Sequence, residues 1–167
     1  TAEMHSQIVY KLELEHALRF ALARNELSMV YQPLVDIKLN KITGAEALIR
    51  WNHPELGIIS PLEFIPIAES SDLIQEIGMF IPIAEETGMI NPIGQWILHT
   101  AIGQCKQWVD AGHTDLLIAI NLSAVQFNNP LLVTMINTIL HEHQLPADNL
   151  ELEITESVAM INIDLTI

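Results

Sequence analysis

The amino-acid sequence predicts an α/β fold in which helices cover a largely parallel sheet. Short apolar segments typical of strands alternate with longer amphipathic segments typical of helices. The strand segments are apolar enough for both faces of the sheet to be covered, as in parallel sheets. The chain has 167 residues, of which 50% are hydrophobic and 17% are charged. It is therefore long enough for about one domain with a hydrophobic core, and a disordered chain is excluded.

The first half of the chain is predicted to form a helix, two strands and a shorter helix. These elements cover residues 5–24, 27–37, 42–51 and 61–69. Apolar side chains recur at roughly helical spacing in the first segment, and a turn separates the two strands. Residues 52–59 contain Pro and Gly and are predicted to be a loop. Ser60 to Glu63 form a capping box with proline at the first helical position, which predicts the short helix.

The second half continues the alternation of helices and strands. The predicted elements are a helix over 91–112, a strand over 115–123, a helix over 129–143 and a strand over 150–157. An Asn-Pro pair marks the start of each helix, and Gly112 ends the longer one. About four strands at this spacing are typical of a (β/α) barrel, which needs eight strands and about 250 residues when closed. We therefore expect a partial TIM-like (β/α) barrel with about half of the barrel present.

Composition and charge exclude several classes of partner. Seven Lys and Arg against 21 Asp and Glu give a net charge of −14, which argues against binding to a DNA or RNA duplex. A phosphate-bearing ligand would need a cation between it and this chain. The single cysteine, Cys105, excludes an internal disulfide framework and suits a reducing, cytoplasmic compartment. We expect Cys105 to be a buried residue of a helix. No apolar run is long enough for a membrane segment in this chain.

Polar side chains stand at inward-facing positions of three predicted strands. Alternation along each strand places Glu46, Asn121 and Glu153 among apolar neighbours, with Asn121 at the carboxyl end of its strand. An ionised carboxylate there is costly unless it is paired or bound to a metal. Two carboxylates and one amide oxygen suit Mg²⁺ or Mn²⁺. The alternative is that all three are strand-end polar groups that face water, and the sequence leaves both interpretations open.

Other polar residues give weaker signals. Arg50 shares a strand face with Glu46 and either binds a phosphate near the metal or pairs with a surface acid. His141 and His143 stand two positions apart and diverge on a helix, so we interpret both as surface residues at a helix end. The sequence contains no glycine-rich phosphate loop, no nucleophile elbow and no zinc pattern.

Five motifs between residues 31 and 157 together resemble the EAL domain, a family that hydrolyses the bacterial second messenger cyclic di-GMP, and the resemblance extends over about residues 14–157. The motifs are Tyr31-Gln32-Pro33, Gly44 to Trp51, Phe80 to Gly94, Asn121-Leu122-Ser123 and Glu153 to Ser157. The resemblance implies the EAL-domain fold and hydrolysis of cyclic di-GMP to linear pGpG with Mg²⁺ or Mn²⁺. Two metal ions would neutralise the phosphate and activate a water for in-line displacement.

The resemblance also assigns roles to individual residues. The implied metal ligands are Glu46, Asn121 and Glu153, of which Glu46 is also the implied catalytic residue. The implied contacts to the cyclic dinucleotide are Gln32, Leu48 and Arg50. Glu156 matches the glutamate that steadies a later loop. A homodimer and an upstream GGDEF or sensory domain are the implied partners, with residues 1–25 as the linker helix and 26–167 as the front part of the EAL domain.

The chain departs from the family pattern after its fourth strand. The Asp-Asp loop, the lysine and the last metal-binding glutamate of the family do not follow. We therefore expect this chain to be an inefficient phosphodiesterase by itself. Two functions stay open: the front of a cyclic di-GMP phosphodiesterase, or a degenerate, inactive module that binds cyclic di-GMP or a protein partner.

A direct repeat interrupts the middle of the chain. Residues 64–79 and 80–95 share the run FIPIAE and three further identical positions. Removing one copy restores an uninterrupted family-like segment, so we interpret the repeat as a tandem duplication. Sixteen residues of a straight helix rotate a side chain by about 160°, so one helix could not bury both copies on one face. We expect one copy to pack in the family position and the other to form an extra helix or loop.

Overall fold

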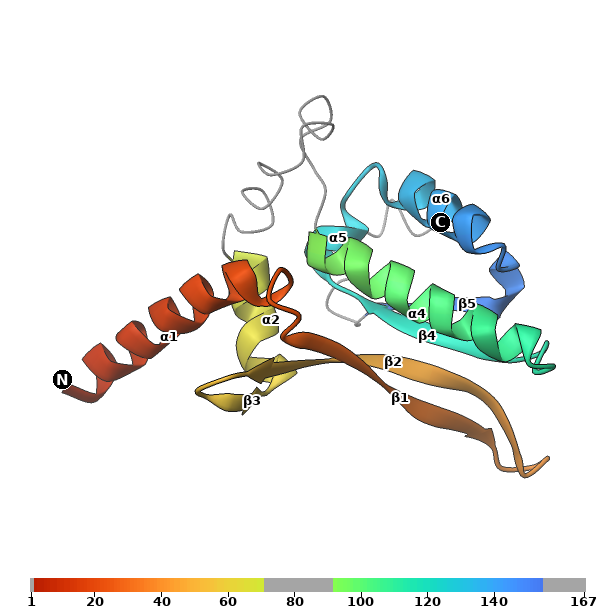
Figure 1. Cartoon of the computed structure of the whole chain (residues 1–167), viewed down its shortest axis with the longest axis horizontal. Coiled ribbons are helices and arrows are strands. Elements are labelled where there is room, and N and C mark those ends of the chain that lie inside the picture. Colours follow the sequence, from red (N-terminus) through yellow and green to blue (C-terminus); the bar gives the residue numbers. More distant parts are fainter. Residues whose placement is uncertain (1, 71–91, 155–167) are drawn as a thin grey trace. The chain divides into compact units, whose positions relative to one another are not determined.

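The computed structural model describes residues 2–70 and 92–154 (Figure 1). The chain divides into two compact units. Unit 1 draws on residues 1–28 and 49–93, and unit 2 draws on residues 29–48 and 94–167. Strands β1 (Leu27–Asp36) and β2 (Lys41–His53) each contribute to both units. Residues 71–79 of the first copy, residues 80–91 of the second copy and Glu156 lie outside the described residues.

Unit 1 contains two helices and a short strand. Helix α1 (Ala2–Ala21) and helix α2 (Pro61–Ser70) are joined by a hydrogen bond from the Tyr10 hydroxyl to Glu63 Oε2, at 3.2 Å. Strand β3 (Gly57–Ile59) pairs antiparallel with the end of β2. The buried side chains of this unit include Leu14, Leu18, Trp51, Phe64 and Ile67. Hydrophobic burial of one face of each helix therefore stabilises this unit.

The start of the first copy, residues 64–70, is part of this core. Its Phe64 ring meets the Trp51 ring edge-on, with centroids 5.6 Å apart, and Ile67 is buried one turn later. The Ser60 hydroxyl accepts the backbone N–H of Leu62, which confirms Ser60 as the cap of α2. The carboxylate of Glu63 accepts from Tyr10, on the neighbouring helix.

Unit 2 is a sheet covered by helices. The strand order is β1-β2-β4-β5, and β2, β4 (Leu117–Leu122) and β5 (Leu150–Ile154) run parallel. Helices α4 (Pro92–Asp110) and α6 (Leu132–His143) pack on this sheet (Figure 1). Helix α5 (Ala124–Phe127) and the 3-10 helix η3 (Ala147–Asn149) connect these elements. The core unites apolar side chains from α4, β4 and α6, among them Leu98, Ile102, Ile118, Ile120 and Ile139.

The α/β class and most predicted elements are confirmed. The prediction of a loop over residues 52–59 was wrong in part, because residues 57–59 form β3. Three residues are too few to give a period-two pattern, and only Ile59 is buried. Helix α5 was missed for the same reason of length. Cys105 lies fully buried in α4, as predicted. No helix in residues 2–70 and 92–154 is long and apolar enough to cross a membrane.

Candidate functional site

Acidic and amide side chains line one face of the parallel sheet in unit 2. Glu46 of β2 pairs in register with Ala119 of β4, which pairs with Glu151 of β5. One step along the same face, Asn121 pairs with Glu153. Paired residues of neighbouring strands point to the same side, and so do alternate residues of one strand. These four polar side chains therefore share one face, as the strand patterns predicted.

A direct contact joins two of the predicted metal ligands. The Asn121 side-chain amide donates from Nδ2 to Glu46 Oε1 at 2.7 Å, although the two residues are 75 positions apart. Asn121 is exposed and Glu46 is half-buried. The contact orients the Glu46 carboxylate and leaves Oδ1 of Asn121 unused in this bond. The strand pairing thus brings together Glu46, Asn121 and Glu153, which the sequence predicted to form one site.

Electrostatics on this face favour a cation. The pKa of Glu153 is raised, first because burial disfavours the charged carboxylate and then because the negative charges of Glu46 and Glu151 repel it. Carboxylate and amide oxygens are the donors that Mg²⁺ and Mn²⁺ prefer, so the residues present fit such an ion in kind. Within the described part of the chain, no group of three His, Cys, Asp or Glu side chains is placed to hold a metal ion. Glu46, Asn121 and Glu153 would thus form part of a ligand set.

A glycine sets the spacing of the two strands that carry Glu46 and Asn121. Gly44 pairs with Leu117, and a Cβ atom at Gly44 would lie 2.5 Å from the Leu117 carbonyl oxygen. Any side chain there would push β2 away from β4 two residues before Glu46. Gly44 therefore permits the close approach on which the contact between Glu46 and Asn121 depends.

The residues predicted to contact a dinucleotide lie on β1 and β2, and none of them is fully buried. Leu48 follows Glu46 on the same strand face and is half-buried, and Gln32 is exposed on β1. Arg50 belongs to unit 1, where its Nη1 donates to the carbonyl of Ile49 at 2.8 Å. No acid within the described residues forms an ion pair with Arg50. The interpretation of Arg50 as one half of a surface ion pair therefore finds no support among these residues.

His143 ends α6, as predicted, but it is half-buried and has a partner on another helix. Its Nε2 lies 3.3 Å from Nδ1 of His99, on α4, and its ring is half-buried. No local sequence pattern indicates this pair, because the two residues are 44 positions apart on different helices. His141 is exposed, as predicted.

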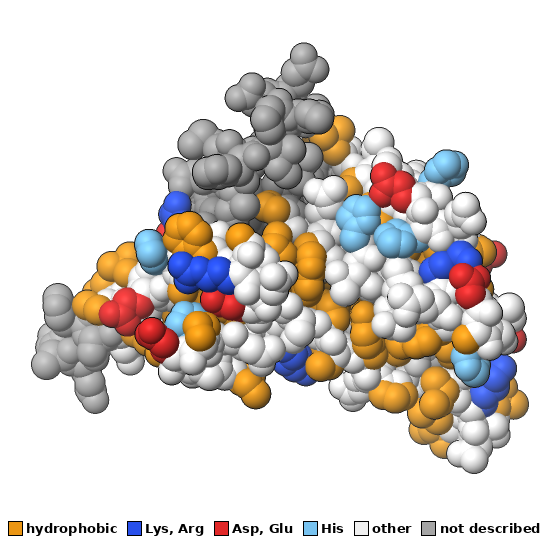
Figure 2. Space-filling model, in the orientation of Figure 1, with side chains coloured by type: hydrophobic (Ala, Val, Ile, Leu, Met, Phe, Trp, Pro, Cys, Tyr) orange, Lys and Arg blue, Asp and Glu red, His pale blue; other side chains and the backbone are white. Residues whose placement is uncertain are grey.

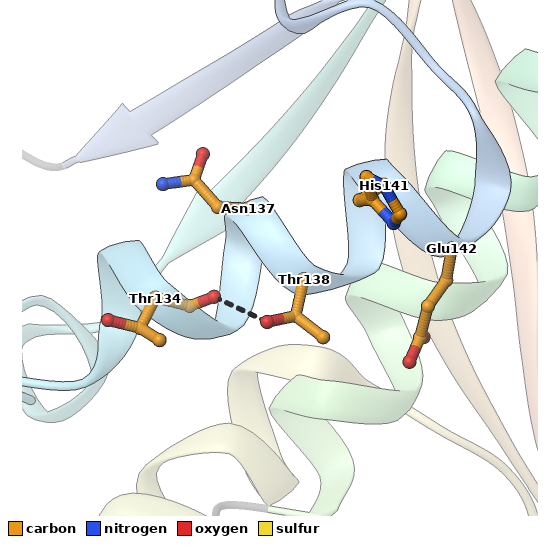
Figure 3. A pocket seen from close by; sticks show the side chains of 5 residues that line it. All are labelled: Thr134, Asn137, Thr138, His141 and Glu142. Carbon is orange, nitrogen blue, oxygen red and sulfur yellow. Dashed lines mark hydrogen bonds between the residues drawn. The ribbon is translucent and has the colours of Figure 1, made fainter.

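A shallow hollow lies along the outer face of α6 (Figure 3). Its lining residues are Thr134, Asn137, Thr138, His141 and Glu142. The Thr138 hydroxyl donates to the backbone carbonyl of Thr134 at 2.9 Å, so part of its polarity is satisfied within the helix. All five residues come from one helix, and they do not enclose a ligand from two sides. The face with Glu46, Asn121 and Glu153 is therefore the stronger candidate site.

Comparison with known families gives a match over nearly the whole chain. The model of the EAL domain matches residues 15–81 and 78–165. The two matched segments overlap at residues 78–81, inside the repeated part of the chain. Together they include every predicted site residue.

Individual relatives agree with this match. The chain is 40% identical over 163 residues to MucR of Pseudomonas aeruginosa, described as a bifunctional diguanylate cyclase and cyclic di-GMP phosphodiesterase. That alignment covers 98% of this chain and 22% of MucR. A solved structure of the MucR phosphodiesterase with c-di-GMP matches with a TM-score of 0.73 and 42% identity, covering 92% of this chain and 56% of that one. The EAL enzyme Bd1971, with cAMP and cyclic-di-GMP bound, matches with a TM-score of 0.76 and 30% identity, covering 93% and 39%.

The chain is thus similar to one part of larger proteins. It spans 21% and 22% of the length of two of its curated relatives and 56% of the MucR phosphodiesterase structure. The structural likeness confirms the predicted EAL-domain fold.

Proposed function

This chain belongs to the EAL domain family, and we propose that it forms part of a metal-dependent cyclic di-GMP phosphodiesterase. The substrate is cyclic di-GMP and the product is linear pGpG. The site is the sheet face that carries Glu46, Asn121 and Glu153. The chain's similarity to the MucR phosphodiesterase supports this substrate class.

One observation carries the proposal: the hydrogen bond between Asn121 and Glu46, with Glu153 in register beside Asn121. Three oxygen-bearing side chains from three successive parallel strands converge on one face of the sheet. The family match covers all three positions. A purely structural role would not require acidic side chains on this face, where each raises the energy of its ionised neighbours.

The residues have distinct roles in the proposed reaction. Glu46, Asn121 and Glu153 would hold Mg²⁺ or Mn²⁺, and a bound ion would neutralise the phosphodiester charge and act as a Lewis acid. Glu46 orients the site through its contact with Asn121. Arg50, Gln32 and Leu48 contact the cyclic dinucleotide, with the Arg50 guanidinium suited to a phosphate oxygen. A cation also explains how a chain with a net charge of −14 accepts an anionic substrate.

A second candidate is an inactive module that binds cyclic di-GMP or a protein partner without hydrolysing it. The repeated segment favours this candidate, because the family match breaks into two overlapping parts there. The two candidates share the binding face and differ in whether pGpG is formed.

We further propose that α1 links the EAL domain to a GGDEF or sensory domain, that Glu156 steadies a loop of the site, and that the protein acts in the cytoplasm as a homodimer. The description of MucR as a bifunctional cyclase and phosphodiesterase supports the first of these. The single, buried cysteine agrees with a reducing compartment.

The test is metal-dependent binding of cyclic di-GMP to the full 167-residue chain. Calorimetry in Mg²⁺ should detect binding that EDTA abolishes, and Glu46→Gln should weaken it at least tenfold, or by about 1.4 kcal/mol. Glu151→Gln is the matched control, because it removes the same charge from the same sheet face at a position outside the predicted ligand set. Chromatography of the same samples for pGpG then separates the phosphodiesterase from the binding module.

Two results would contradict the proposal. One is binding of cyclic di-GMP that is equally strong with EDTA. The other is an equal loss of affinity in Glu46→Gln and Glu151→Gln, since that pattern would reflect surface charge alone. Circular dichroism of each variant shows whether the fold is kept.

A further inference from the structure

Two histidines and a glutamate meet between α4 and α6, apart from the proposed oxygen site. Nδ1 of His99 lies 3.3 Å from Nε2 of His143, and the two rings are 5.5 Å apart between centroids. Nε2 of His99 lies 3.8 Å from Oε2 of Glu142. Figure 2 shows histidine side chains beside an acidic one on the face over these helices. The cluster belongs entirely to unit 2.

The Glu142 carboxylate influences which nitrogen of the His99 ring carries the proton. A negative oxygen beside Nε2 favours the tautomer that carries its proton on this nitrogen. The lone pair of His99 is then on Nδ1, which faces Nε2 of His143. A carboxylate near the outer nitrogen is also found beside metal-bound histidines in proteins, where it accepts a hydrogen bond at shorter range than the 3.8 Å seen here.

Packing holds the two rings in place. Leu98 and Ile102 of α4 and Ile139 and Leu140 of α6 are buried in the same core, so the helices that carry the histidines are fixed. Gly103 makes room for the second ring: a Cβ atom there would lie 3.0 Å from Cε1 of His143. The histidine pair is therefore preorganised, with both rings half-buried and open to water on one side.

The distance between the two nitrogens suits a shared metal ion. Zinc binds imidazole nitrogen at about 2.0–2.1 Å with tetrahedral angles, which places two ligand nitrogens about 3.3 Å apart. We propose that His99 Nδ1 and His143 Nε2 bind a transition-metal ion of the Zn²⁺, Ni²⁺ or Cu²⁺ class. Glu142 supports the site electrostatically, because its carboxylate lies 3.8 Å from the outer nitrogen of His99. The ion would lie between these two nitrogens, His99 Nδ1 and His143 Nε2.

A metal ion at this site would link α4 to α6 on the helical layer of unit 2. The described residues supply two direct ligands and no third His, Cys, Asp or Glu placed to join them, so water completes the coordination. Imidazole selects these ions over Mg²⁺, which prefers oxygen donors. The histidine site thus differs in metal preference from the oxygen site with Glu46, and it does not depend on the proposed phosphodiesterase function.

Calorimetry of the full chain with ZnCl₂ tests the proposal, in excess Mg²⁺ so that oxygen sites are occupied. One equivalent of Zn²⁺ should bind, and His99→Ala and His143→Ala should each weaken this binding at least tenfold. Glu142→Gln should weaken it by about tenfold, as loss of a supporting carboxylate does. His141→Ala is the matched control, since His141 is an exposed histidine on the same helix, and it should bind Zn²⁺ as the parent does.

A second variant keeps both ligands and changes only their spacing. Gly103→Ala drives a methyl group against the His143 ring and should also weaken zinc binding. Imidazole ¹⁵N spectra of the parent should shift at Nδ1 of His99 and Nε2 of His143 on addition of Zn²⁺. Absence of zinc binding, full binding in His99→Ala, or an equal loss in His141→Ala would each overturn the proposal. If a histidine variant does not fold, the ¹⁵N spectra of the parent chain test zinc binding instead.

Discussion

The carboxylate of Glu26 accepts a hydrogen bond from the end of β2. Its removal should lower the free energy of unfolding of unit 1. The Trp51 indole donates from Nε1 to Glu26 Oε2 at 3.0 Å, and the backbone N–H of Asn52 donates to the Glu26 carbonyl at 2.8 Å. Trp51 is fully buried and Glu26 is only 8% exposed. Replacing Glu26 with Ala keeps the backbone bond and leaves the buried indole N–H without its acceptor.

The magnitude follows from the cost of an unsatisfied buried donor. That cost is about 1–3 kcal/mol, so Glu26→Ala should lower the free energy of unfolding by roughly 2 kcal/mol. Such a loss corresponds to about a 30-fold change in the folding equilibrium. Glu26→Gln retains an acceptor oxygen and should lose less, because only the charge assistance of the bond disappears.

Urea unfolding followed by far-UV circular dichroism provides the assay. Glu55→Ala is the control, since it removes an exposed acid near the end of the same strand and should change stability by less than about 0.5 kcal/mol. Trp51→Phe removes the donor, and Glu26→Ala should cost much less in that background. An equal cost in both backgrounds would refute the assignment of the loss to this hydrogen bond.

Three further predictions concern Gly44, Glu153 and Cys105. Gly44→Ala should destabilise the protein by about 1–3 kcal/mol in urea unfolding, because its methyl group meets the Leu117 carbonyl; an unchanged midpoint would show that the strands do not approach as described. Glu46→Gln should lower the pKa of Glu153 in EDTA, measured by NMR titration, because removing a nearby negative charge makes ionisation of Glu153 easier; burial still holds that pKa above its usual value, and a rise would contradict the assigned cause. Cys105 should react with Ellman's reagent far more slowly in the folded chain than in urea, because burial shields the thiol and raises its pKa; fast reaction of the folded chain would contradict this burial.

The sheet face with Glu46, Asn121 and Glu153 could be predicted because its determinants are local. Period-two alternation assigns each side chain to a face, and parallel strands bring their carboxyl ends to one edge. The register that joins Asn121 to Glu46 followed only from the structure. It depends on how closely β2 approaches β4 at Gly44, which no local pattern encodes.

Contacts between distant elements were beyond prediction for a physical reason. The pair formed by His99 and His143 depends on the packing of two helices, and the sequence of neither helix indicates which residue its histidine meets. The acceptor role of Glu26 was missed because an acid just before a strand has the same local pattern as a solvated loop residue. In both cases a residue that looked ordinary along the chain acquires its partner from another element.

The most direct test of the proposed metal site is paramagnetic relaxation by Mn²⁺ in the ¹H–¹⁵N spectrum of the full chain with cyclic di-GMP. Mn²⁺ broadens signals of nearby amides, so it reports where the ion binds regardless of turnover. The strongest broadening is expected at the amides of Glu46, Asn121 and Glu153, and Glu46→Gln should reduce it. Strongest broadening at the histidine pair or at the exposed acid Glu13 of α1, with these three signals unaffected, would contradict the assignment of this sheet face as the metal site.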